Sequence, residues 1–189
     1  MKNKILYFDT ETSGVKSHEN ALLQIGMIVE IDGVEKETKQ INIQPHKDDV
    51  IEEGALKVNG LKREDFPSFT PPAKALREIQ TFLKKYVNPY QKSDKFIPAG
   101  YHISFDIKFL RSFFFKNGDK FFGSFFHKET IDPMEEMRKL YNTGEIDTPN
   151  YKLTSVCEYF NIDLDKAHDA LSDIIATKRL IVLRKTQPE

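Results

Sequence analysis

The chain has 189 residues, of which 39% are hydrophobic and 30% are charged, and its formal net charge is −1. These values are typical of one soluble globular domain over residues 1–189, and they argue against tight clamping of nucleic acid through many phosphate contacts. The single cysteine, Cys157, excludes an intrachain disulfide and is expected to be buried. Because the apolar run Ile5–Phe8 is too short for a signal peptide or a membrane span, we expect a cytoplasmic protein without membrane contact.

Three consecutive strands are predicted at the start of the chain. Residues 4–9 and Leu22–Ile31 are apolar runs, and residues 36–44 alternate between polar and apolar side chains. Asp32-Gly33, between the last two runs, is a strong signal for a hairpin turn. The segment 45–70 contains several glycines and prolines and is expected to form loops with short helical turns.

Helices and short strands alternate in the rest of the predicted structure. Five helix starts are expected: at Pro71, after the caps Ser104 and Asp132, at Leu153, and after the cap Asp169. Short strands are expected at Phe96–Gly100 and near His127–Ile131, although Pro98 counts against the first because proline cannot donate a ladder hydrogen bond. This order predicts an α/β domain with a mixed five-stranded sheet flanked by helices.

Five residues are candidates for a metal-dependent nuclease site: Asp9, Glu11, Asp106, His168 and Asp173. Asp9 and Glu11 are two residues apart at the end of a strand, so their side chains point the same way. Carboxylates brought together raise each other's pKa, and such a pair usually has a cation to bind. His168 is expected on the loop entering the last helix, where an imidazole can take a proton from water. Taken alone, Asp106 and Asp173 are each explained as acids at a helix N-terminus.

Three ordered motifs carry a resemblance to a known family: Phe8–Gly14, Ser104–Leu110 and His168–Asp173. Two further stretches, Ala55–Leu61 and Tyr151–Cys157, are also similar. Together they resemble the DEDDh 3′–5′ exonucleases, the group that contains the proofreading subunit of bacterial DNA polymerase III, ribonuclease T and oligoribonuclease. The resemblance spans nearly the whole chain and implies a ribonuclease H-like fold.

The resemblance also implies a reaction and a set of site residues. Two Mg²⁺ or Mn²⁺ ions would be held by Asp9, Glu11, Asp106 and Asp173, with His168 as general base. Water would attack the terminal phosphodiester and release a nucleoside 5′-monophosphate from the 3′ end. Oxygen ligands favour magnesium or manganese over zinc. The residues expected to contact substrate are Thr10, Thr12, Gly14, Val15, Asn59 and Phe105.

The chain departs from the family pattern at two places. Tyr101-His102 follow Gly100 where the family usually has His-Asn, and Asn59 stands where the family usually has histidine. Neither position is a metal ligand in the family, so these departures affect the handling of substrate more than the chemistry.

Nine of the fifteen phenylalanines lie between Phe105 and Phe126. Phe105, Phe109 and Phe113 have the spacing of a buried helix face. Two or three of the others are expected to be exposed, where they would stack on bases or form a dimer surface.

The predicted function is 3′–5′ exonuclease activity, with single-stranded DNA 3′ ends preferred as substrate. An exoribonuclease that trims RNA or short oligoribonucleotides is the first alternative. A non-catalytic nucleic-acid-binding or polymerase-accessory module is the second, and the presence of all five catalytic residues argues against it. The sequence is also compatible with a homodimer. A polymerase partner is not indicated, because only a short tail follows the last predicted helix.

Overall fold

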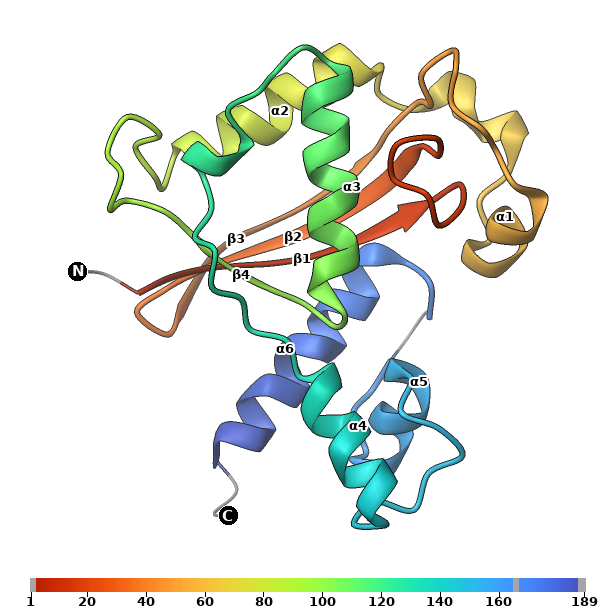
Figure 1. Cartoon of the computed structure of the whole chain (residues 1–189), viewed down its shortest axis with the longest axis vertical. Helices are drawn as coiled ribbons and strands as arrows, with labels where there is room; N and C mark the ends of the chain where they lie inside the picture. The colour runs from red at the N-terminus through yellow and green to blue at the C-terminus, as the bar shows by residue number, and fades with distance from the viewer. Residues whose placement is uncertain (1–2, 165–166, 187–189) are drawn as a thin grey trace.

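A mixed sheet of four strands lies at the centre of the molecule in the computed structural model, which describes residues 3–164 and 167–186 (Figure 1). Its strands are β1 (Lys4–Thr12), β2 (Leu22–Ile31), β3 (Val34–Asn42) and β4 (Ile97–Ala99). Their order across the sheet is β3-β2-β1-β4, with β4 parallel to β1 and the other neighbours antiparallel. The strand β1 therefore has a hydrogen-bonded neighbour on each side.

The predicted hairpin between β2 and β3 is confirmed. Asp32 and Gly33 have φ angles of 51° and 79°. Two successive residues in the left-handed region form the tight turn whose twist matches that of the flanking strands. The strand β3 starts and ends slightly earlier than predicted.

The predicted fifth strand near His127–Ile131 is wrong within the residues that the structure describes. This segment runs parallel to β4 but forms only two isolated bridges, Phe126 with Phe96 just before β4 and Ile131 with Ala99. Pro98 has no N–H with which to continue a ladder, although its carbonyl accepts a hydrogen bond of 2.9 Å from the N–H of Ile131. The residues between the two bridges are exposed, and the expected five-stranded sheet has four described strands.

Helices cover both faces of the sheet (Figure 1). They are α1 (Glu53–Asn59), α2 (Pro72–Lys84), α3 (Ile103–Lys116), α4 (Met134–Thr143), α5 (Leu153–Tyr159) and α6 (Ala170–Thr186), with short 3-10 turns at Arg63–Ser68 and Phe122–Ser124. The side chains of Leu6 and Phe8 pack with α2 and α3, whereas Ile5 and Tyr7 pack with α6. Alternate residues of β1 thus face two separate cores. No described helix has both the length and the apolar character needed to cross a membrane.

Asp132 accepts backbone hydrogen bonds at the start of two helices. Its carboxylate oxygens accept hydrogen bonds from the backbone N–H groups of His102 at 2.9 Å and Ile103 at 3.1 Å, at the start of α3. It also accepts one of 3.0 Å from the N–H of Met134, the first residue of α4. The N-cap of α4 is Pro133, one residue later than the predicted cap Asp132. The predicted cap Ser104 is wrong: α3 begins one residue before it, because the cap comes from a distant segment.

Candidate active site

The pleat of β1 places Asp9 and Glu11 on the face that α6 covers. Residues two apart on a strand point to the same side, and Ile5 and Tyr7 already face α6. Asp9 and Glu11 continue that row toward the end of the strand, as predicted. Glu11 is 9% exposed, and a bulge follows it in the pairing with β2. The polar end of β1 therefore lies next to the first turn of α6.

Two residues of β2 fix the position of that first turn. An added Cβ on Gly26 would lie 2.6 Å from the carbonyl of Ala170, so only glycine allows this close approach. The side-chain oxygen of Gln24 accepts a hydrogen bond of 2.9 Å from the N–H of Ala170. Since Gly26 pairs with Asp9 across the sheet, α6 begins directly beside the first carboxylate.

Asp169 is the predicted N-cap of α6, and the structure confirms it. Its carboxylate accepts a hydrogen bond of 3.3 Å from the N–H of Ser172, the third residue of the helix. Asp173 follows in the first turn. The start of α6 therefore places the Asp173 carboxylate over the end of β1.

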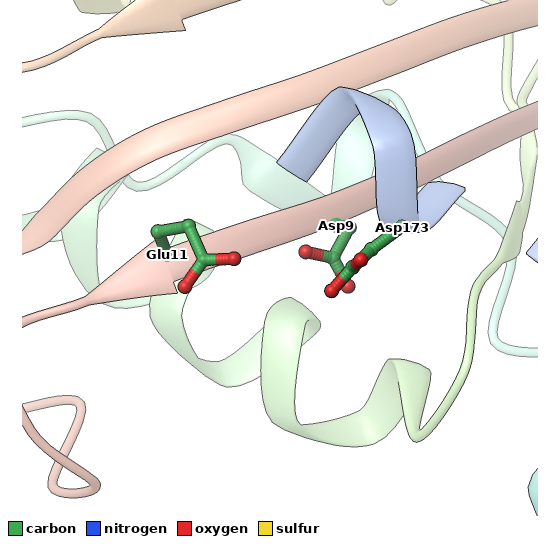
Figure 2. A group of neighbouring side chains, drawn as sticks. All are labelled: Asp9, Glu11 and Asp173. Atoms are coloured by element: carbon green, nitrogen blue, oxygen red, sulfur yellow. The ribbon is translucent and has the colours of Figure 1, made fainter. Parts of the chain in front are cut away.

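Three carboxylates meet where β1 and α6 come together. Oxygen atoms of Asp9, Glu11 and Asp173 all lie within 4.8 Å of one another. Figure 2 shows the Asp9 and Asp173 carboxylates side by side, with Glu11 reaching toward them from further along the strand. Clustered oxygen donors suit hard divalent cations such as Mg²⁺ and Mn²⁺. These three residues fit a metal site without any rearrangement.

Asp106 approaches the same strand from α3, on the other face of the sheet. It is 3% exposed, and its Oδ1 accepts two hydrogen bonds from Thr10, of 3.0 Å from the backbone N–H and 2.6 Å from the hydroxyl. Both bonds end on Oδ1, and neither uses Oδ2. Asp106 is not one of the three grouped carboxylates, yet its charge is the largest single charge effect on Asp9.

Burial raises the pKa of all four carboxyl groups. The pKa of Glu11 rises to about 7 and that of Asp173 to about 6, with burial as the largest cause in each case. Burial also raises the pKa of Asp106 to about 8, against the two hydrogen bonds from Thr10 that favour its charged form. The pKa of Asp9 rises well above its usual range through burial and then through the neighbouring acids. A cation would relieve this repulsion.

His168 lies in the turn before α6, as the sequence predicts, with a left-handed φ of 64°. Its backbone N–H donates to both carboxylate oxygens of Asp173 at 3.3 Å, and the residue is exposed. The backbone of His168 is therefore tied to a candidate metal ligand, while its imidazole faces solvent. Its role as a general base stays a prediction.

The residues predicted to contact substrate fall into two groups. Thr10, Thr12 and Asn59 are buried and bonded within the protein: Asn59 donates a hydrogen bond of 3.1 Å to the carbonyl of Thr12 and accepts one of 3.1 Å from the N–H of Leu61. This anchors α1 to the end of β1. Val15 is 75% exposed, and Phe105 is partly exposed.

Gly14 and Phe105, also predicted to contact substrate, each have close neighbours within the protein. Gly14 accepts a hydrogen bond of 2.7 Å at its carbonyl from the Thr12 hydroxyl, and an added Cβ there would lie 2.4 Å from the side chain of Asn20. The ring of Phe105 stacks near His102, with centroids 6.0 Å apart. Contact of any of these residues with substrate stays a prediction.

Gln24 and Gly26 support the site but were missed from the sequence. Both interrupt the apolar run of β2, where a polar side chain and a glycine are unusual. A glycine inside a strand often marks the close approach of another backbone, so this signal was present. Nothing in the sequence indicated which backbone approaches.

A model of the exonuclease family RNase_T matches residues 6–181. The chain belongs to this exonuclease family. The predicted group, the DEDDh 3′–5′ exonucleases, is thereby confirmed as the family of this chain. A specific likeness to the proofreading subunit of DNA polymerase III is not shown.

Solved structures of exonuclease I share the fold of this exonuclease chain. Escherichia coli exonuclease I in complex with a dT13 oligonucleotide has a TM-score of 0.80 and 22% identity, covering 97% of this chain and 41% of that one. The zinc-bound E. coli enzyme with single-stranded DNA has a TM-score of 0.79 and 21% identity, covering 98% and 41%. A product-bound exonuclease I has a TM-score of 0.79 and 19% identity, covering 99% and 44%.

These likenesses establish the ribonuclease H-like α/β fold of the exonuclease chain. The chain spans only 41% of the length of the E. coli structures it matches. No curated protein matches the sequence.

Proposed function

We propose that this exonuclease removes nucleoside 5′-monophosphates from the 3′ ends of single-stranded DNA. The observation that carries the proposal is the convergence of Asp9, Glu11 and Asp173, whose oxygen atoms lie within 4.8 Å of one another. Membership of the exonuclease family supports the reaction class. The oligonucleotide and single-stranded DNA bound to structurally similar exonuclease I support the choice of substrate.

The four carboxylates are proposed to hold two Mg²⁺ or Mn²⁺ ions. When bound, such ions lower the pKa of water and stabilise the entering and leaving oxygens of the phosphodiester. Asp9, Glu11 and Asp173 contribute from the α6 side of β1. Asp106 contributes from the α3 side, where Thr10 holds one of its oxygens and leaves the other outside those two bonds.

His168 is proposed as the group that takes the proton from the attacking water. His168 is exposed, and it lies beside the carboxylate cluster because its backbone N–H is hydrogen-bonded to the Asp173 carboxylate. Replacing His168 by alanine is expected to lower kcat by about 10²–10⁴-fold, the usual contribution of a general base.

The exposed side chain of Val15 is proposed to contact the terminal base, and Phe105 to contact the strand beside α3. Residues 1–189 are proposed to form one exonuclease domain, since the family match runs from β1 to α6. A cytoplasmic location stays a prediction.

RNA ends are the second candidate substrate, because the family is named for a ribonuclease.

End-labelled single-stranded and duplex DNA and RNA test the substrate and the direction of cleavage. We expect single-nucleotide shortening of single-stranded DNA from its 3′ end in Mg²⁺ or Mn²⁺, and none with a chelator. Faster shortening of matched RNA would replace DNA by RNA as the substrate. Binding without cleavage of any substrate would favour the non-catalytic module.

The variant Asp9→Asn tests the carboxylate cluster itself. It removes one charge with little change in shape, so activity should fall to background while the metal-free melting temperature rises through relief of repulsion. The matched control is Asp147→Asn, an exposed aspartate outside the site, which should leave both quantities unchanged. Retained activity in Asp9→Asn would overturn the site assignment.

A further inference from the structure

A second charged hollow lies on the outer side of α3, between that helix, β4 and the segment 122–128. Its volume is about 310 Å³, and its lining is Lys95, Pro98, Ile107, Arg111, Phe122, Gly123, Phe126, His127 and Lys128. In Figure 1 the chain after α3 passes beside that helix and then beside β4. Backbone hydrogen bonds from Phe96 to Phe125 and from His127 to Phe96 hold this segment against the strand.

The lining of this hollow contains basic side chains and no carboxylate. Lys95, Arg111 and Lys128 are positively charged, and His127 adds ring nitrogens that can donate hydrogen bonds. Within residues 3–164 and 167–186, none of these four forms an ion pair with an acid. The hollow is thus a local concentration of positive charge on a chain of formal charge −1.

Four other hollows on the described surface differ in this respect. Each includes at least one acid in its lining, respectively Asp94, Glu78, Glu53 and Glu35. The first of these adjoins Lys95 and His127, but its Asp94 is already bonded to the ammonium group of Lys4 and to the N–H of Asn88.

Two of the cations are held in place by neighbouring groups. The guanidinium of Arg111 lies 5.2 Å from the ring centre of Phe122, an arrangement that orients a cation without neutralising it. Lys95 donates a hydrogen bond of 2.5 Å to the carbonyl of Gly123. The rings of Phe122 and Phe126 are buried and stacked at 4.6 Å, which gives the hollow a rigid apolar floor.

The hollow is separate from the carboxylate site although both involve α3. Asp106 points into the protein toward Thr10, whereas Ile107 and Arg111 line the hollow. Successive helix residues are rotated by about 100°, so the two sets of side chains leave the helix in different directions.

We propose that this hollow is a phosphate-binding site, taking the phosphate of a nucleotide that is either free or part of a nucleic-acid strand. A guanidinium with lysines beside it is the usual recognition chemistry for phosphate oxygens. The volume is close to the lower limit, about 300 Å³, of small-molecule sites, so it suits one phosphate-bearing unit and not a folded chain. The inference does not depend on the hydrolytic reaction.

Binding without divalent metal tests the proposal with two probes, thymidine 5′-monophosphate by calorimetry and a labelled single-stranded oligothymidylate by fluorescence anisotropy. The double variant Arg111→Gln with Lys128→Gln removes two charges from the hollow. The matched control, Lys36→Gln with Lys92→Gln, removes two charges from exposed lysines elsewhere. If the double variant fails to fold, Lys128→Glu alone replaces it, since Lys128 is exposed.

We expect the variant in the hollow to lower the affinity for at least one probe by about tenfold, and the control to change it little. A loss of affinity for the mononucleotide identifies a free nucleotide as the ligand. Loss for the oligonucleotide alone identifies a strand, and the salt dependence of its log affinity should then weaken by about 0.7 per phosphate contact removed. Equal affinity in the wild type and the variant, equal loss in the control, or no binding by the wild type would overturn the proposal.

Discussion

At the scale of single residues, Thr10 links the two faces of the candidate site. Its backbone and hydroxyl both donate to Asp106 on the α3 side, while its neighbours Asp9 and Glu11 point to the α6 side. The strand β1 therefore binds Asp106 from α3 on one face and carries Asp9 and Glu11 on the other face, which α6 covers. Without these two bonds, burial would raise the pKa of Asp106 even further.

The variant Thr10→Val tests this link. It keeps the shape and the backbone N–H but removes the hydroxyl that donates at 2.6 Å to Asp106. A buried hydrogen bond to a charged group contributes about 1.5–3 kcal/mol, so the free energy of unfolding should fall by that order when Asp106 is ionised. Because the pKa of Asp106 is raised to about 8, the loss should be larger above that pH than below it.

Denaturant unfolding on both sides of this pKa measures the effect. Thr38→Val is the matched control, since its hydroxyl donates to Glu35 at 3.1 Å on the exposed surface and its loss should matter little. Equal losses in the two variants at both pH values would show that the Thr10 hydroxyl does not stabilise the charged form of Asp106.

At the scale of elements, the contact of α6 with β2 decides whether Asp173 reaches Asp9. Gly26 admits the backbone of Ala170, and Gln24 caps its N–H. The helix is otherwise fixed by apolar contacts of Ile174 and Ile181 with Ile5 and Tyr7 of β1. Apolar contacts set the face on which the helix lies, whereas the close approach at Gly26 sets where its first turn lies along the strand.

The variant Gly26→Ala is expected to displace the first turn of α6 and separate Asp173 from Asp9. The new methyl group would overlap the Ala170 backbone at 2.6 Å, and backbone cannot move aside as a flexible side chain can. Overpacking of this kind costs about 1–3 kcal/mol of stability. Activity should fall further than the loss of folded protein explains.

Activity and thermal unfolding measured on the same sample separate these two effects. Gly54→Ala serves as the control, because an added Cβ there meets nothing within 4 Å. Gly54 is helical, so this change should leave activity intact and add up to about 0.5–1 kcal/mol of stability. Full activity in Gly26→Ala would show that the position of the α6 start does not control the site.

At the scale of the whole molecule, the carboxylate cluster opposes folding when no metal is bound. The pKa of Glu11 is raised from 4.5 to about 7 and that of Asp106 from 3.8 to about 8, so the folded chain binds more protons than the unfolded chain in between. The stabilising effect of these protons is complete below the ordinary pKa values and is lost as the pH rises through the raised ones. A divalent cation competes with those protons.

The melting temperature of the metal-free protein should therefore be lower at about pH 8 than at about pH 5.5. Added Mn²⁺ should raise it at both values, and by more at the higher pH, because a ligand that binds only the folded state stabilises it by mass action. Calorimetry with and without a chelator measures the shift, and Asp9→Asn should reduce it. A melting temperature unchanged by millimolar Mn²⁺ would contradict the metal site.

The phenylalanines between Phe105 and Phe126 differ in how well their burial follows from the sequence. Phe109 and Phe113 are buried, as their helical spacing predicts, whereas Phe105 at the same spacing is partly exposed. Two of the remaining rings, Phe115 at 66% and Phe121 at 72%, are exposed. Spacing identified the buried face of α3, but exposure after the helix depends on how the chain turns back toward β4.

The sequence alone determined the order of the main elements, the acidic character of the candidate site and the placement of Asp9 and Glu11 on one face of β1. These are local properties, because strand pleat, turn chemistry and helix capping depend on residues close together in the chain. The family motifs added the expectation that distant acids share one site.

Only the tertiary structure decided how those acids meet. The grouping of Asp9 and Glu11 with Asp173, and the separate attachment of Asp106 to Thr10, depend on which helix covers which face. The absence of the predicted fifth strand from the described residues, and the hydrogen bonds of Asp132 to the start of α3, likewise depend on contacts between segments far apart in the chain. Such contacts follow from packing the whole core, and a local pattern does not encode them.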